Sequence, residues 1–315
     1  MRTIGLLFAS LLISSAHAQE APGLMRIVVP FPPGGSNDVI ARAIAPVLAK
    51  RLGNTVIVEN KPGAAGVVGA DAVAKAPRDG SHLLLTSSTF LTAAATQPRV
   101  PFDAITAFAP VAMIAQGPLL LVVPAGAPFK NATELLDSAR TKPGALNYGT
   151  AGVGSVAHLA TELLNANVGI RMTHVPYKGA ANAVLDLAAG QINVMISGYS
   201  SIVPMLKSGK VRALAVTSAK PSPAFPDLPP LAATVPNYEI EVWAGVLATA
   251  GTPAPLVQRL NREINEISAS PELKVLLDPD GSVPVAMDAA AFGARLRQEL
   301  GLWKKIAAER QISVD

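Results

Sequence analysis

Two glycine-containing loops carry the residues whose types and spacing could bind a ligand. The first spans residues 26–38, RIVVPFPPGGSND, where a short apolar run leads into prolines, two glycines and a Ser-Asn-Asp cluster. Apolar residues at helical spacing follow, so the loop connects a strand to the N-terminus of a helix. Backbone N–H groups at such a turn attract anions, and the helix dipole strengthens the attraction. The loop therefore predicts a site for a carboxylate or phosphate that needs no charged side chain.

A second loop repeats this order of elements further along the chain. Residues 145–158 read ALNYGTAGVGSVAH and again lead from a short strand through glycines into a helix. Taken alone, each loop is also compatible with an ordinary turn in which a serine or asparagine caps the helix. The occurrence of two such loops favours two halves of one anion-binding site. Neither has the GxGxxG spacing of a dinucleotide site or the Gly-Lys-Ser/Thr of a P-loop, so we expect no cofactor.

Ser155 and His158 raise a catalytic alternative, because side chains three residues apart on one helix are neighbours. The sequence around Ser155 lacks the G-x-S-x-G elbow of a serine hydrolase, and no carboxylate is placed to orient His158. We therefore interpret Ser155 as a helix N-cap and His158 as a donor at or beside the ligand. The four histidines lack metal-ligand spacing and the chain has no cysteine, so we predict no metal site and no thiol chemistry.

The elements that must position these loops are short apolar strands alternating with amphipathic helices. This alternation is typical of an α/β fold with parallel sheets and crossover helices. We expect strands at residues 26–29, 55–59, 82–86, 145–148, 171–176, 192–196 and 211–217. Between them we expect helices at residues 37–52, 66–76, 132–140, 156–166, 181–189 and 202–207. Near the C-terminus we expect a strand at residues 239–249 and long amphipathic helices at residues 255–268 and 289–310.

The alternation divides into two units, each opening with one of the two loops. Residues 117–126, GPLLLVVPAG, form a suitable linking strand, and a proline-dense segment after Lys220 leads back to the first unit. We therefore expect one lobe from residues 19–121 plus 220–315 and a second from residues 122–219. Ligands of open α/β sheets bind where strands end, so a cleft between the lobes is the predicted site.

The N-terminus indicates export. Arg2 precedes a largely apolar run, and Ala16-His17-Ala18 matches an A-x-A cleavage site. Residues 1–18 therefore read as a cleaved signal peptide, which predicts a periplasmic protein. The net charge of +4 is small and no basic run is interleaved with aromatic residues, which argues against a nucleic-acid partner.

Several motifs in this order resemble the Bug (TctC-like) family, the periplasmic substrate-binding proteins of tripartite tricarboxylate transporters. They include PFPPGGSND, VENKPGAAGVVGADAVAKAPRDGS, NYGTAGVGSVAHLATELL, VPYKGAANAVLDLAAGQI, GKVRALAVTSAK and WAGVLATAGTPAPLVQRLN. The resemblance covers essentially the whole chain after the signal peptide. It implies a type II Venus-flytrap protein with two lobes, which closes on a small carboxylate and delivers it to a two-component membrane permease. We expect a monomer without enzymatic activity.

The resemblance also implies which residues contact the ligand. Backbone donors of the two loops would hold its carboxylates, and three further segments at strand ends would add contacts. The implied ligand-binding residues are Phe31, Pro33, Gly34, Gly35, Ser36, Asn37, Asp38, Ser87, Ser88, Thr89, Thr150, Ala151, Gly152, Gly154, Ser155, His158, Lys178, Gly179, Ala180, Ser197 and Tyr199.

One departure from the family pattern bears on the ligand. Members that bind amino acids have an aspartate after the strand that here reads INVMIS, whereas this chain has Ser197. The resemblance therefore implies an acid without an amine. Two alternatives stay open: an exported hydrolase or isomerase, and a sensor subunit that presents its closed form to a signalling receptor.

Overall fold

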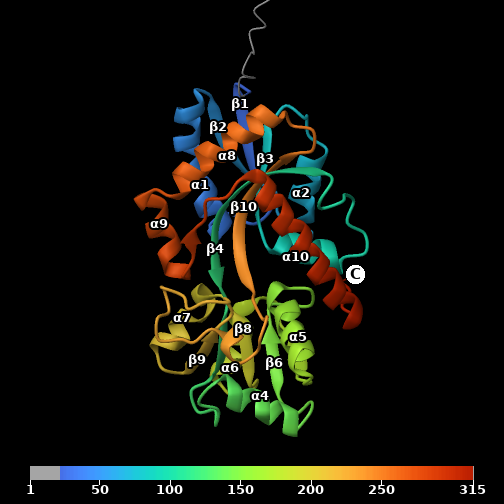
Figure 1. Ribbon diagram of the computed structural model, residues 1–315, viewed down its shortest axis with the longest axis vertical. Coiled ribbons are helices and arrows are strands. Elements are labelled where there is room, and N and C mark those ends of the chain that lie inside the picture. Colours follow the sequence, from blue (N-terminus) through green and yellow to red (C-terminus); the bar gives the residue numbers. More distant parts are fainter. Residues whose placement is uncertain (1–21, 315) are drawn as a thin grey trace, which may run out of the picture.

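The structure is a computed structural model that describes residues 22–314. The predicted signal peptide, residues 1–18, lies outside the described residues. Among those described, no helix combines the length and the apolar character needed to cross a membrane. The chain forms two lobes, one above the other in Figure 1, and each is built on its own sheet.

The first lobe contains a six-stranded sheet with strand order β11-β4-β10-β3-β1-β2. Its strands are β1 (Leu24–Val29), β2 (Thr55–Asn60), β3 (His82–Ser87), β4 (Phe108–Pro118), β10 (Glu241–Thr249) and β11 (Val283–Pro284). Alternate residues of β1 enter different cores, because successive side chains of a strand point to opposite faces. Ile27 and Val29 belong to one buried cluster and Val28 to another.

Helices cover both faces of this sheet. Helices α1 (Ser36–Leu52) and α8 (Ala254–Ser268) bury Ile40, Ile44 and Ile264 in the cluster that contains Ile27. Helices α2 (Val67–Ala74), α3 (Thr89–Thr96) and α10 (Ala289–Glu309) contribute to the cluster that contains Val28. Helix α9 (Pro271–Leu277) and the short 3₁₀ helix η3 (Asp278–Asp280) connect α8 to β11. Neither α3 nor α9 is among the helices that the sequence predicted.

The second lobe contains a five-stranded sheet with strand order β7-β6-β8-β5-β9. Its strands are β5 (Leu120–Pro124), β6 (Asn147–Thr150), β7 (Thr173–Pro176), β8 (Val194–Ser197) and β9 (Val211–Val216). Its helices are α4 (Ala132–Thr141), α5 (Val156–Val168), α6 (Ala180–Ala188) and α7 (Tyr199–Lys207). The predicted two-lobed α/β fold is confirmed.

The sheets differ from the prediction in strand direction. They are mixed, because β10 pairs antiparallel with β3 and β4, and β5 pairs antiparallel with β8 and β9. The expectation of parallel sheets holds within the strand–helix–strand units, such as β1 with β2 and β6 with β7. It fails next to the connections between the lobes, where a strand enters its sheet from the other lobe rather than from a crossover helix.

Two chain segments connect the lobes, and Thr217 joins them. One segment passes from β4 to β5 through Leu119, and the other leaves β9 and reaches β10 past Ile240. Leu119 N–H donates to Thr217 Oγ1 at 2.7 Å, and Thr217 N–H donates to the Leu119 carbonyl at 2.9 Å. Ile240 N–H donates to the Thr217 carbonyl at 2.9 Å, and Thr217 Oγ1 lies 2.6 Å from the Ile240 carbonyl oxygen. Thr217 is fully buried, so these bonds hold both segments together without competition from water.

Helix α10 and the residues after it form a further contact between the lobes. The helix packs against α3 of the first lobe and α5 of the second, on the right of Figure 1. Val314 N–H donates to the Thr96 carbonyl at 2.9 Å, while Arg310 pairs with Glu162 of α5 at 3.4 Å. One buried cluster continues through this region and includes Leu159 of α5 and Trp303 of α10. The region between the lobes, here called the waist, is therefore closely packed on the side where α5 and α10 lie.

Replacing Thr217 with Val preserves the shape of the side chain but leaves the buried Leu119 N–H without its acceptor. We expect this change to lower the free energy of unfolding by about 2 kcal/mol, the usual penalty for a buried unpaired donor. Thr217→Ser keeps the hydroxyl and loses one methyl group, so a loss of about 1 kcal/mol is expected. Urea unfolding followed by circular dichroism measures both. Equal stability of Thr217→Val and wild type would contradict this role of the hydroxyl.

Candidate ligand-binding cleft

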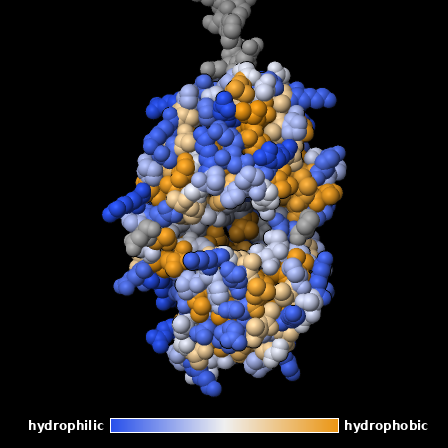
Figure 2. Space-filling view, turned by 180° about the vertical axis from the view of Figure 1, so that it is seen from behind, coloured by the Kyte–Doolittle hydropathy of each residue, from blue (hydrophilic) through white to orange (hydrophobic). Residues whose placement is uncertain are grey.

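A cavity of about 530 Å³ lies between the lobes, beside α1 and α7. From one face of the molecule a hollow is visible between the lobes, with hydrophobic residues inside it (Figure 2). Residues from both lobes, from the connecting segments and from the α9–η3 region line the cavity. They are Phe31, Gly34, Gly35, Ser36, Asn37, Val39, Ile40, Ser87, Ala115, Pro118, Leu119, Gly198, Tyr199, Ser200, Val242, Trp243, Ala244, Leu276, Leu277, Asp280 and Ser282.

Two helices present their N-termini to this cavity, one from each lobe. Helix α1 begins after Gly35 and helix α7 after Gly198, and neither has a hydrogen bond from a capping side chain. The first N–H groups of a helix have no partner within the helix, so an uncapped N-terminus offers several donors to an anion. The cavity thus has two sets of backbone donors, one from each lobe.

The remaining wall is apolar or carries hydroxyl groups. Phe31, Leu119 and Trp243 contribute apolar surface, whereas Ser87 and Ser200 contribute hydroxyls. Among the described lining residues, none is Lys, Arg or His, and Asp280 is the single residue with a formal charge. Such a wall suits a solute with an apolar body and a polar end.

Trp243 is held in this wall from two directions. Its backbone N–H donates to Ser88 Oγ at 3.0 Å, and Ser88 N–H donates to the Trp243 carbonyl at 3.2 Å. Its indole N–H donates to Glu299 Oε2 at 2.8 Å, and the Trp303 indole donates to the other oxygen of Glu299 at 3.1 Å. Burial raises the pKa of Glu299, against the lowering by its hydrogen bonds from Trp303 and Trp243. Ser88 thus supports the wall rather than lining the cavity.

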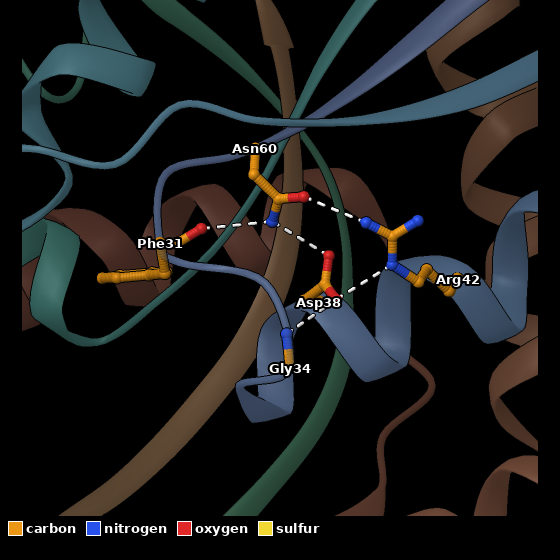
Figure 3. Close-up of polar contacts among 5 residues, drawn as sticks. All are labelled: Phe31, Gly34, Asp38, Arg42 and Asn60. Carbon is orange, nitrogen blue, oxygen red and sulfur yellow. Dashed lines mark hydrogen bonds and ion pairs between the residues drawn. The ribbon is translucent and has the colours of Figure 1, made fainter.

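Asp38 does not line the cavity, and its carboxylate holds the first loop in shape through hydrogen bonds (Figure 3). It is buried and accepts hydrogen bonds from Arg42 Nε, Gly34 N–H and Asn60 Nδ2, each at 2.9 Å. Asn60 Nδ2 also donates to the Phe31 carbonyl at 3.1 Å. The Arg42 bond, followed by the Gly34 bond, lowers the pKa of Asp38 to about 2. The Gly34 N–H is thereby used within the protein, and the free donors of this loop lie at the start of α1.

The second predicted loop lies outside the cavity, on the packed side of the waist. Ser155 Oγ accepts from His158 N–H, so Ser155 caps α5 as the sequence predicted. Gly154 lies against Thr96 and Val314, since an added Cβ would come within 2.7 Å of an atom of each. This loop therefore contacts α3 and the C-terminal residues. The sequence had instead suggested that it forms the second half of an anion-binding site with the first loop.

His158 is part of a buried stack behind this loop. Its ring lies 3.8 Å from that of His174, and its Nδ1 accepts from Gly154 N–H at 3.2 Å. His174 Nε2 lies 2.7 Å from Thr150 Oγ1. Burial lowers the pKa of both histidines to about 4, so both rings are neutral near pH 7. In this structure the pair supports the loop after β6.

The structure thus brings together one part of the predicted site. The predicted residues that line the cavity are Phe31, Gly34, Gly35, Ser36, Asn37, Ser87 and Tyr199. Those that do not line it are Pro33, Asp38, Ser88, Thr89, Thr150, Ala151, Gly152, Gly154, Ser155, His158, Lys178, Gly179, Ala180 and Ser197.

The predicted residues omit fourteen of the lining residues, and three of these are Gly198, Trp243 and Asp280. Gly198 directly follows the predicted Ser197, and its position before a helix is a usable signal. The position of Trp243 in an apolar strand is equally compatible with packing in the core. Asp280 lies in a connection between a short helix and a short strand, and nothing in its local pattern indicates a cavity.

The hydrogen bonds of Asp38 predict a pH-dependent loss of stability. Its pKa is lower in the folded protein than the value of about 4 in an unfolded chain, so the unfolded state binds more protons between pH 4 and 2. The stabilisation by Asp38 is therefore present above about pH 4 and is lost as the pH falls towards 2. The difference in unfolding free energy between wild type and Asp38→Asn should shrink across this range in urea titrations.

The exposed Asp137 of α4 offers a control on the other lobe. At about pH 6, Asp137→Asn should change the unfolding free energy relative to wild type by less than Asp38→Asn does. A difference for Asp38→Asn that stays constant from about pH 6 to 2 would contradict the assigned hydrogen bonds.

Comparisons with known proteins place this geometry in a family. The family model described as tripartite tricarboxylate transporter family receptor matches residues 40–312. A UPF0065 protein from the tcbD-tcbE intergenic region of Pseudomonas sp. (strain P51) is 39% identical over 290 residues, which cover 91% of this chain and 86% of the relative. Protein BugT of Bordetella pertussis is 34% identical over 288 residues, covering 90% of this chain and 88% of BugT.

Two solved structures share the fold at similar sequence identity. Rpa4515 of R. palustris with adipate has a TM-score of 0.77 and 34% identity, over 92% of this chain and 98% of its own. MatC of Rhodopseudomonas palustris with bound malate has a TM-score of 0.73 and 30% identity, and the match covers 90% of this chain and 98% of MatC. The chain therefore belongs to the Bug (TctC-like) family of tripartite tricarboxylate transporter receptors, which are solute-binding proteins and not enzymes.

Proposed function

We propose that this protein binds a small organic acid between its two lobes in the periplasm and delivers it to a two-component membrane permease. The observation that carries the proposal is the pair of uncapped helix N-termini, α1 and α7, at one cavity. Backbone donors of this kind suit a carboxylate. The family membership and the adipate and malate of the two related structures support the same ligand class.

The proposed mechanism is closure of the lobes around the ligand. A carboxylate that contacts donors of both lobes is bound more tightly in the closed state, and this difference in affinity shifts the equilibrium towards closure. The lobes turn about the segments that Thr217 joins, and Pro118, Leu119 and Val242 of these segments line the cavity. Closure also excludes water, which strengthens each hydrogen bond to the carboxylate.

We further propose that the other predicted residues of the second lobe act when the lobes close. Strands β6, β7 and β8 are parallel neighbours, so their C-terminal ends lie along one edge of the sheet. The loop of residues 150–155, the Lys178–Gly179–Ala180 segment and Gly198 follow these three strands in turn. Residues 122–219 thus form a lobe that presents one row of loops to the first lobe, with Ser155 and His158 supporting the first of them.

A sensor role is the second candidate. A sensor would use the same binding site, but its closed form would bind a signalling receptor instead of a permease. Whether a permease or a sensor kinase is encoded beside this chain distinguishes the two roles. Ligand turnover is not expected, because the family consists of binding proteins.

Filling the cavity from Gly198 tests the site directly. Gly198 has a φ of −65°, which any residue adopts, and no atom lies within 4 Å of an added Cβ. Gly198→Leu should therefore fold normally and weaken carboxylate binding at least about tenfold, because its side chain occupies the cavity. A thermal-shift screen of mono-, di- and aromatic carboxylates identifies ligands, and calorimetry on wild type and variant gives the Kd values.

Gly301→Leu provides the matched control. Gly301 lies on the exposed surface of α10, also with open space around an added Cβ, and away from the cavity. It should bind carboxylates like wild type. Equal affinities of Gly198→Leu, Gly301→Leu and wild type would reject this cavity as the ligand site, and a screen in which no organic acid raises Tm would reject the proposed ligand class.

A further inference from the structure

A carboxylate of the protein itself lies at the N-terminus of α1. Asp280 ends the 3₁₀ helix η3, which follows α9 in the first lobe and contacts α7 of the second. Asp280 Oδ2 accepts a hydrogen bond from Ser36 Oγ at 3.3 Å, and Ser36 is the first residue of α1. Asp280 therefore lines the cavity beside the donors that the proposed function assigns to the ligand.

The position of η3 is fixed by contacts on both sides. Gly281, directly after Asp280, has a φ of +65°, and an added Cβ would come within 2.4 Å of Phe225. The ring of Phe225 lies 5.1 Å from that of Tyr199, the first residue of α7 in the second lobe. Ser282 N–H donates to the Leu277 carbonyl at 3.3 Å, and Ser282 lies against Gly117 of β4. These contacts hold Asp280 at the mouth of the cavity, so its charge acts on any ligand there.

The charge of Asp280 is not balanced within the cavity wall. The described lining residues include no Lys, Arg or His, so the donors available to anions are backbone N–H groups, hydroxyl groups and the side-chain amide of Asn37. Two carboxylates a few ångströms apart repel, and the repulsion grows as closure removes water between them. A single ligand carboxylate can use the donors of α1 and α7. A second one near Asp280 meets a like charge with no cation to compensate it.

We infer that Asp280 is a specificity-determining residue: it disfavours a second ligand carboxylate and favours an acid that also carries a hydrogen-bond donor, a hydroxyl or an ammonium group. The inference rests on the proposed carboxylate-binding function and narrows its ligand class. It also modifies the expectation drawn from Ser197. The sequence shows no acid after β8 to pair with an amine, but Asp280 supplies one to the same cavity from a different element.

The test compares wild type with Asp280→Asn, which keeps the shape and removes the charge. Six-carbon ligands that differ in one terminal group are titrated by calorimetry: hexanoate, adipate, 6-hydroxyhexanoate and 6-aminohexanoate. If six-carbon ligands are too long to bind to wild type, the corresponding four-carbon ligands are titrated instead. Asp280→Asn should bind the dicarboxylate about fivefold more tightly and the amino acid about fivefold more weakly, with little change for the monocarboxylate.

Asp278→Asn is the matched control. Asp278 belongs to the same 3₁₀ helix, is exposed and does not line the cavity, so its charge should not discriminate among the four ligands. Asp280→Ser, which also removes the charge, replaces Asp280→Asn if the latter fails to fold. Ligand preferences that are the same in wild type, the Asp280 variant and Asp278→Asn would overturn the inference while leaving the proposed function intact. If no carboxylate of either set binds to any of these proteins, the proposed function fails and the inference with it.

Discussion

The hydrogen bonds of Thr217 join the two connecting segments at the boundary between the lobes. This buried residue binds Leu119 of the first segment and Ile240 of the second. The pairing of β4 with β10, at Pro118 and Glu241, and that of β5 with β9, at Leu120 and Val216, continue on either side of it. The same segments then form the wall of the cavity, through Pro118 and Leu119 on one side and Val242 and Trp243 on the other. In the proposed closure, a rotation of the lobes about these segments would change the width of the cavity and so couple ligand contact to the relative position of the lobes.

The contacts between the lobes are asymmetric, and this asymmetry would give the proposed closure a direction. On one side, α10 packs against α3 and α5, Arg310 pairs with Glu162, and Tyr238 OH donates to the Ala160 carbonyl at 2.9 Å. On the other side, α1 and α7 face each other across the cavity. Breaking buried contacts costs more than changing the width of a solvated cavity. The proposed closure would thus change mainly the α1–α7 side, where the helix N-termini lie.

Local signals in the sequence were sufficient for the first loop, the capping of α5 by Ser155 and the division into two α/β lobes, because each depends on residues close together in the chain. The buried position of the Asp38 carboxylate depends on a hydrogen bond from Asn60, and the position of the second loop depends on Thr96 and Val314. Asp280 reaches the cavity only because η3 packs between the lobes. Such features arise from contacts between distant segments, which the pattern of one segment does not encode.

The helices that face the cavity lack a side-chain cap, as α2, α3, α6 and α8 also do, whereas four other helices are capped. Asn131, Ser155, Ser270 and Asp288 cap α4, α5, α9 and α10 with their own side chains, so part of the donor set of these helices is already bonded. The two helices that face the cavity follow Gly35 and Gly198, which have no side chain to compete with a ligand. Ser88 could cap α3, but its Oγ accepts from Trp243 N–H instead. Gly179 leaves α6 uncapped at the same edge of the second sheet, so the proposed closure would add a third set of backbone donors from α6 to those of α1 and α7.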